Sequence, residues 1–266
     1  MISEGSCQVE NGRVYVQRGG DGPPLLLIAG GTGSAEAYRA LSAGLSGEYT
    51  VLTYDRRGHF RSKDRSEGSI TVARHADDAR AVIEHFGYGK ALVFGSSAGA
   101  QIGLALATRH PEVVDGLAAH EPPAVRLLPD ADAWLELAAE QVALTGQGEV
   151  FEAVKGFIGS IAGAGLPGLK TVRLPHESEW RRLFLRELTE IYEYLPDVEA
   201  LRGGGVPIVL AAGTGSRGYY HYRPARTLAL ELGLPFVEMP GAHLAPQRNA
   251  AEFAAALGEI LTDLLV

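Results

Sequence analysis

Cysteine is almost absent from the sequence, because Cys7 is the only one among 266 residues. A single thiol excludes an internal disulfide framework and a cysteine-rich zinc site, and it fits a reducing compartment. We expect Cys7 to be an unreactive thiol near a mobile terminus. With 46% hydrophobic residues, the chain can instead build one substantial apolar core without covalent links.

Positive charge is scarce as well, since 24 Lys and Arg residues are outnumbered by 32 Asp and Glu residues and the net charge is -8. A nucleic-acid partner is not expected, because a basic surface that could neutralise phosphates is missing. Uninterrupted apolar runs of about 18 residues are missing too, and residues 1–10 have neither the basic nor the apolar region typical of a leader. We therefore expect a cytoplasmic protein with no membrane partner.

Short β-rich apolar runs alternate with segments of helical spacing along most of the chain. Asn11-Gly12, between two alternating runs, predicts a tight antiparallel hairpin at the start. The strands expected after it are residues 25–29, 50–54, 91–94, 114–119, 208–211 and 236–239. The helices expected between them are residues 35–45, 71–86, 98–109, 223–232 and 250–264. This alternation predicts the α/β class, with a mostly parallel open sheet and helices on both faces.

The alternation is interrupted once, by a helical and strand-poor stretch with expected helices at residues 131–144, 149–161 and 177–194. We expect residues 1–122 and 205–266 to form the core domain and residues 123–204 to form an inserted helical cap. Apolar residues recur at helical spacing in each cap helix, among them Trp134, Phe157 and Trp180. Part of each apolar stripe is expected to cover a substrate pocket.

The sequence G-S-S-A-G at residues 95–99 joins an expected strand to an expected helix. This is the context of a nucleophile elbow, a turn so tight that glycine is needed two residues before and two residues after the serine. Ser97 is then the exposed residue at the apex. An ordinary glycine-lined turn between a strand and a helix is the alternative.

With this elbow, the chain resembles the α/β-hydrolase superfamily over nearly its whole length. Residues 25–34 look like the family's strand and oxyanion loop, with Ala29-Gly30 in place of the usual histidine–glycine pair. The resemblance implies that the backbone N–H groups of Gly31 and Ala98 form the oxyanion hole, and we expect Gly30 and Thr32 to contact the substrate. A phosphate-binding loop is the alternative, but a P-loop lysine and G-x-G-x-x-G spacing are missing.

A second stretch, residues 54–62, is similar to the charged loop that follows the next strand in the superfamily. Such a turn mostly braces the fold, and we interpret Asp55, Arg56 and His59 as structural. His59 borders the pocket in such folds and is the histidine most easily mistaken for a catalytic one.

A serine hydroxyl needs a base, so a histidine from another loop must reach Ser97. Among eight histidines, only His243 lies between the last expected strand and the terminal helix, where the resemblance places the base. His75, His85 and His110 lie on or at the ends of expected helices. His176, in the cap, and His221, in the loop after residues 208–211, are candidates to contact substrate but have no positional claim to be the base.

The third member of the triad departs from the family pattern. Most relatives carry an aspartate after the penultimate strand, where this chain has Ser216, and no Asp or Glu occurs at residues 202–230. Glu121, after the strand that follows the elbow helix, is the best substitute and preserves the order nucleophile, acid, base. A structural role for Glu121 is the alternative, and Glu238 is the weaker candidate acid.

These residues predict a serine hydrolase that needs neither cofactor nor metal, acting on an ester, lactone or related bond of a small hydrophobic molecule. Ser97 attacks the carbonyl and His243 moves the proton. Besides the residues already named, Ser216 and Tyr219 are expected to contact the substrate. A natural-product lyase or cyclase with His243 or Glu121 as general base, and a non-catalytic small-molecule binder, are the alternatives.

Overall fold

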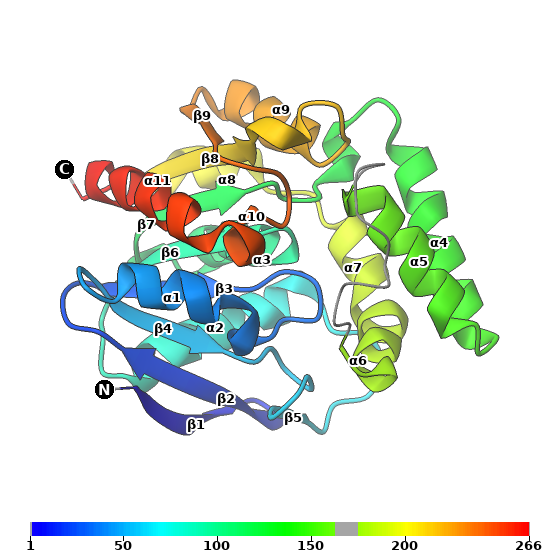
Figure 1. Cartoon of the computed structure of the whole chain (residues 1–266), viewed down its shortest axis with the longest axis horizontal. Helices are drawn as coiled ribbons and strands as arrows, with labels where there is room; N and C mark the ends of the chain where they lie inside the picture. The colour runs from blue at the N-terminus through cyan, green and yellow to red at the C-terminus, as the bar shows by residue number, and fades with distance from the viewer. Residues whose placement is uncertain (1, 163–174, 266) are drawn as a thin grey trace.

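The computed structural model describes residues 2–162 and 175–265 and contains a nine-stranded sheet (Figure 1). The strand order is β1-β2-β4-β3-β6-β7-β8-β9, with β5 paired to β2. The pairs β1/β2 and β2/β4 are antiparallel, and every neighbouring pair from β4 to β9 is parallel. The strands are β1 Ser3–Val9, β2 Gly12–Gly19, β3 Pro24–Ile28, β4 Thr50–Tyr54, β5 Lys63–Asp64, β6 Ala91–Ser96, β7 Val114–His120, β8 Ile208–Gly213 and β9 Phe236–Met239. The predicted mostly parallel open sheet is therefore confirmed.

Helices cover both faces of this sheet, because its central strands are apolar on both sides. In β3, Leu26 and Ile28 join one buried cluster while Leu25 and Leu27 join another. Helices α1 and α11 pack together on one face (Figure 1), whereas α2 and α3 pack together on the other. The flanking helices are α1 Arg39–Leu45, α2 Val72–His85, α3 Ala98–Arg109, α8 Val198–Gly203, α9 Tyr222–Leu232, α10 Ala245–Arg248 and α11 Ala250–Asp263.

The first hairpin is longer than its sequence pattern indicates. Its turn lies at Glu10-Asn11, one residue earlier than the predicted Asn11-Gly12, because Gly12 already pairs with Val9; Asn11 has a φ of 56°. Strand β1 nevertheless begins at Ser3, because the backbone pairs with β2 although most of its side chains are exposed. Cys7 is thus buried within a strand, where burial raises the pKa of its thiol to about 11. The expectation that Cys7 lies near a mobile terminus was wrong.

The described residues of the strand-poor stretch form α4 Ala131–Gly146, α5 Val150–Ala162, α6 Glu177–Arg182 and α7 Leu188–Glu193, which we call the helical insert. These four helices lie together on one side of the sheet (Figure 1). The single helix expected at 177–194 is interrupted by a π-helical turn at Leu183–Glu187. Helix α8, also within the range expected for the cap, contacts α3 and α9. None of the described helices combines the length and the apolar character needed to cross a membrane.

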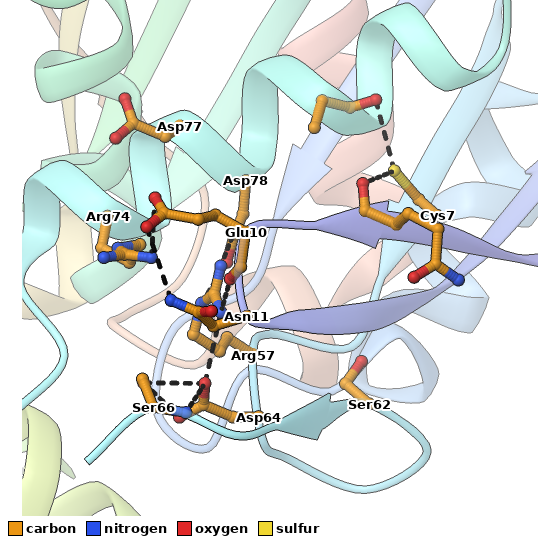
Figure 2. Close-up of polar contacts among 12 residues, drawn as sticks. Cys7, Glu10, Asn11, Arg57, Ser62, Asp64, Ser66, Arg74, Asp77 and Asp78 are labelled. Carbon is orange, nitrogen blue, oxygen red and sulfur yellow. Dashed lines mark hydrogen bonds and ion pairs between the residues drawn. The ribbon is translucent and has the colours of Figure 1, made fainter.

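The charged loop after β4 connects the antiparallel edge of the sheet to α2. The guanidinium of Arg57 is buried and donates to both carboxylate oxygens of Asp78 on α2, to Asp64 on β5 and to the backbone oxygen of Glu10 (Figure 2). A buried ion pair of this kind strongly destabilises a fold when one partner is removed. Arg57 therefore braces the fold through α2, β5 and the first hairpin.

Candidate active site

Ser97 lies at the turn between β6 and α3, with φ 58° and ψ -128°. This region of backbone space is unfavourable for a residue other than glycine and is found where the surrounding structure imposes it, often at functional sites. The N–H of Ser97 donates to the backbone oxygen of His120 at 2.9 Å, which fixes the turn against the end of β7. The Ser97 side chain lies half-buried on the wall of a cavity.

Close backbone packing explains the two glycines of the turn. A Cβ atom at Gly95 would collide with the backbone of Gly99, and one at Gly99 would collide with the backbone oxygen of Ile28. The spacing that suggested a nucleophile elbow is thus a steric requirement of this strand–turn–helix unit.

His243 lies in the loop after β9 and lines the same cavity as Ser97. Its Nδ1 is 2.6 Å from Oε2 of Glu121, and both side chains are buried. Because an ionised carboxylate only accepts hydrogen bonds, the proton lies on Nδ1, and Nε2 is left free to accept one. Nucleophilic catalysis by a serine requires a histidine in this tautomer, and the two side chains line one cavity.

Glu121 follows β7 directly and has a φ of 48°. Its Oε1 accepts from the N–H of Gly213 at 2.7 Å. Burial alone would raise the pKa of Glu121, but the neighbouring imidazoles of His120 and His243, with the hydrogen bond from His243, hold this pKa well below its ordinary range. The carboxylate is therefore charged at neutral pH and can stabilise a positive charge on His243.

Two further histidines surround this carboxylate; sequence reasoning considered His221 only for contact with substrate and gave His120 no role. Nε2 of His221 lies 3.4 Å from Oε2 of Glu121, and the rings of His221 and His243 are 4.4 Å apart. His120 Nε2 lies 3.9 Å from Oε1. Burial lowers the pKa of His120 to about 4 and that of His221 to about 3, so both are neutral at pH 7. The adjacency of His120 to Glu121 in the sequence is the one signal that could have drawn attention to His120.

The other positions considered for the acid lie apart from His243. Ser216 is buried, and its hydroxyl lies 3.2 Å from Nε2 of His221. Glu238 on β9 binds Arg217 and the hydroxyl of Tyr222 instead, and Arg217 lowers its pKa to about 2. Among the carboxylates that we considered, Glu121 is the one that contacts His243.

The loop after β3 faces the elbow. Gly31 and Ala98 border one small cavity together with Ser97. Ala98 is the first residue of α3, so its N–H has no acceptor within that helix. Gly31 and Ala98 thus lie beside Ser97, and their role as an oxyanion hole stays a prediction.

A cavity of about 570 Å³ lies between the strand ends and the helical insert. Four residues predicted to contact substrate line it, with Gly30 and Thr32 on the sheet side and Phe157 and Trp180 on the insert side. Other apolar lining residues are Tyr38, Phe60, Ile158, Ile161 and Leu244. This cavity is large enough for a small ligand and mostly apolar, as ligand sites are.

Three residues expected to contact substrate do not line this cavity. Trp134 stacks on Tyr220 at 4.1 Å, and its indole N–H donates to Asp130, so its side chain packs within the protein. Ser216 faces His221. Tyr219 borders an adjoining cavity of about 100 Å³ that also reaches His243. Helical periodicity identified the apolar face of α4 but not what this face contacts.

Within the described residues, Glu121, His221 and His243 form the one group of potential metal ligands, with ligand atoms within 4.8 Å of one another. A metal ion bound by two such atoms at about 2.1 Å holds them roughly 3 Å apart or more. The 2.6 Å contact between Glu121 and His243 is instead that of a charge-assisted hydrogen bond.

The parallel sheet, the strained serine turn and the histidine–glutamate pair are features of one protein class, the α/β hydrolases. A sequence profile described as "alpha/beta hydrolase fold" matches residues 23–163, which is more than half of the chain. The chain therefore belongs to the α/β-hydrolase fold family.

Individual relatives support the same assignment. The chain is 34% identical over 276 aligned residues to the "Uncharacterized hydrolase YraK" of Bacillus subtilis, covering 98% of this chain and 96% of that protein. It is 26% identical to the "2-(acetamidomethylene)succinate hydrolase" of Mesorhizobium japonicum, covering 89% and 87%. Among solved structures, an esterase from Thermogutta terrifontis is similar with a TM-score of 0.77 and 19% identity over 100% of both chains.

Proposed function

We propose that this protein is a serine hydrolase that cleaves an ester-type bond, such as an ester or a lactone, through an acyl-enzyme. Ser97 attacks the carbonyl carbon, and Nε2 of His243 takes the proton of the hydroxyl. His243 then protonates the leaving alcohol, and water releases the acyl group by the reverse sequence. The N–H groups of Gly31 and Ala98 stabilise the oxyanion.

One observation carries this proposal: Ser97, in its strained turn, and His243, held by Glu121 at 2.6 Å, line the same cavity. Some other hydrolytic reactions on this fold need a carboxylate as the nucleophile. The residue at the apex of the turn here is Ser97, which offers a hydroxyl instead and argues against those reactions. The charged state of Glu121 supports a role in stabilising the imidazolium during the reaction.

A fluorophosphonate probe tests the proposal directly, because it phosphonylates only an activated serine. We expect one probe per chain, attached to Ser97 and located by mass spectrometry of the digested protein. Labelling should be lost in Ser97→Ala. Tight binding of esters with no labelling would contradict the proposal and would support a non-catalytic binder.

The apolar cavity predicts a preference for hydrophobic acyl groups. An aryl hexanoate should be hydrolysed with a kcat/KM at least about tenfold above that of the acetate, because burying additional methylenes in an apolar site stabilises the transition state. Phe157→Ala should reduce this ratio several-fold, since Phe157 is buried and lines the cavity.

Phe151→Ala is the matched control, because Phe151 lies on the same helix but is 63% exposed. It should leave the hexanoate-to-acetate ratio unchanged. Equal kcat/KM values for the two esters in the unmodified protein would refute the preference.

A further inference from the structure

The loop that carries Gly31 wraps around the buried side chain of Arg56. Nη1 of Arg56 donates to the backbone oxygen of Ala29 at 2.9 Å, and Nη2 donates to that of Gly31 at 2.6 Å. The backbone N–H of Arg56 donates to the backbone oxygen of Gly33 at 2.8 Å. A Cβ atom at Gly33 would lie 2.6 to 2.8 Å from atoms of the Arg56 side chain, so only glycine allows this close approach.

These contacts determine the direction of the Gly31 N–H. The N–H of Gly31 and the carbonyl of Gly30 belong to the same peptide unit. This carbonyl accepts from the N–H of Gly33 at 2.9 Å. In a trans peptide the N–H points opposite to the carbonyl. Arg56 fixes the peptide units on either side, through the carbonyls of Ala29 and Gly31. The N–H of Gly31 is therefore held on the face away from the Gly30 carbonyl.

A carboxylate of the helical insert binds the same guanidinium. Oε2 of Glu187, in the π-helical turn, accepts from Nη2 of Arg56 at 2.7 Å, and neither side chain is exposed. Burial would raise the pKa of Glu187, but Arg56 and His59 outweigh this effect and keep the pKa well below its ordinary value. Glu187 is thus charged, and π-helical turns of this kind are frequent at functional sites.

His59 and His75 complete the surroundings of Glu187. Nε2 of His59 lies 2.7 Å from Oε1 of Glu187, and Nδ1 of His59 lies 2.8 Å from Oε2 of Glu179 on α6. Nε2 of His75 on α2 lies 3.4 Å from Oε2 of Glu187. Through His59, two carboxylates of the insert thus bind the loop after β4.

We propose that Arg56 and Glu187 are positioning residues for the oxyanion hole, so that docking of the helical insert orients the Gly31 N–H. This inference rests on the proposed hydrolase function and extends it. Without Glu187, the guanidinium loses the partner that directs it toward the loop carbonyls. Without Arg56, the peptide units around the Gly31 N–H lose their fixed orientation.

Arg56→Met tests the inference, because methionine keeps an unbranched chain but removes every donor. Loss of one oxyanion donor costs about 10²- to 10³-fold in kcat, and a misdirected donor should cost about 10- to 10²-fold, with KM changed less than about threefold. Affinity for an aryl trifluoromethyl ketone, whose hemiketal oxyanion occupies the same site, should fall in parallel. Glu187→Gln, which keeps the side-chain volume, should show the same pattern more weakly.

Arg57→Met is the matched control, because Arg57 is the next residue and is equally buried and ion-paired, but it contacts Asp78 and Asp64 (Figure 2). It should lower Tm and leave the kcat of the folded fraction within about threefold. Arg56→Lys keeps the charge opposite Glu187 but has a single nitrogen for the two carbonyls, so it should fold more stably than Arg56→Met without recovering kcat.

The inference is overturned if Arg56→Lys and Glu187→Gln retain the kcat and ketone affinity of the unmodified protein. It is equally overturned if they lose activity only in proportion to unfolding, as expected for Arg57→Met. Failure of the proposed function would look different, because the unmodified protein would then not be labelled by the fluorophosphonate at all.

Discussion

Ser97→Ala is expected to lose essentially all ester hydrolysis, with kcat reduced by at least about 10⁴-fold. Removal of the hydroxyl abolishes the covalent step, and only binding and the oxyanion hole are left to accelerate attack by water. Alanine has the same backbone preferences as serine at a φ of 58°, so the turn should persist. Substrate affinity should be retained, because the apolar cavity is unchanged.

Steady-state hydrolysis of an aryl hexanoate and Tm together test this expectation. Ser96→Ala is an informative comparison, because it removes the neighbouring hydroxyl, which lies 2.9 Å from Nδ1 of His120. We expect this variant to keep kcat within about tenfold of the unmodified protein. Turnover by Ser97→Ala at a rate near that of the unmodified protein would show that Ser97 is not the nucleophile.

The features that sequence alone predicted are those set by local sterics and chain order. The five residues of the elbow identify the turn by themselves. Gly95 and Gly99 are required by contacts within the strand–turn–helix unit and with the strand beside it. Apolar runs predicted β4 and β9 with the bounds that they have. The choice of His243 as the base came from the family resemblance, which places the base between the last strand and the terminal helix.

The features that sequence alone did not predict depend on contacts between distant segments. Arg56 and Glu187 are 131 residues apart, and no local pattern shows that a glutamate of the insert meets this loop. The apolar stripe of α4 identified Trp134 as part of a packed face but not its partner Tyr220. Strand β1 extends through exposed polar residues because backbone pairing with β2, rather than side-chain burial, holds it.

Glu121→Gln is expected to lower kcat by about 10² to 10⁴, which corresponds to roughly 3 to 5 kcal/mol of transition-state stabilisation. The structure explains why an isosteric amide cannot replace the carboxylate. Oε1 must accept from the N–H of Gly213 at 2.7 Å, so the amide oxygen takes that position and the amide NH₂ group faces Nδ1 of His243. An NH₂ donor there favours the tautomer with its proton on Nε2, which cannot accept the proton of Ser97.

Glu238→Gln is the matched control, because it makes the same chemical change at the other carboxylate considered for the acid, which binds Arg217. This variant and Ser216→Ala should each keep kcat within about threefold of the unmodified protein. Burst kinetics with an aryl ester would place the loss in Glu121→Gln at acylation, since the burst should disappear when proton removal from Ser97 becomes limiting. If Glu121→Gln hydrolyses the best ester within about threefold of the unmodified rate, Glu121 is structural and His243 works without a carboxylate partner.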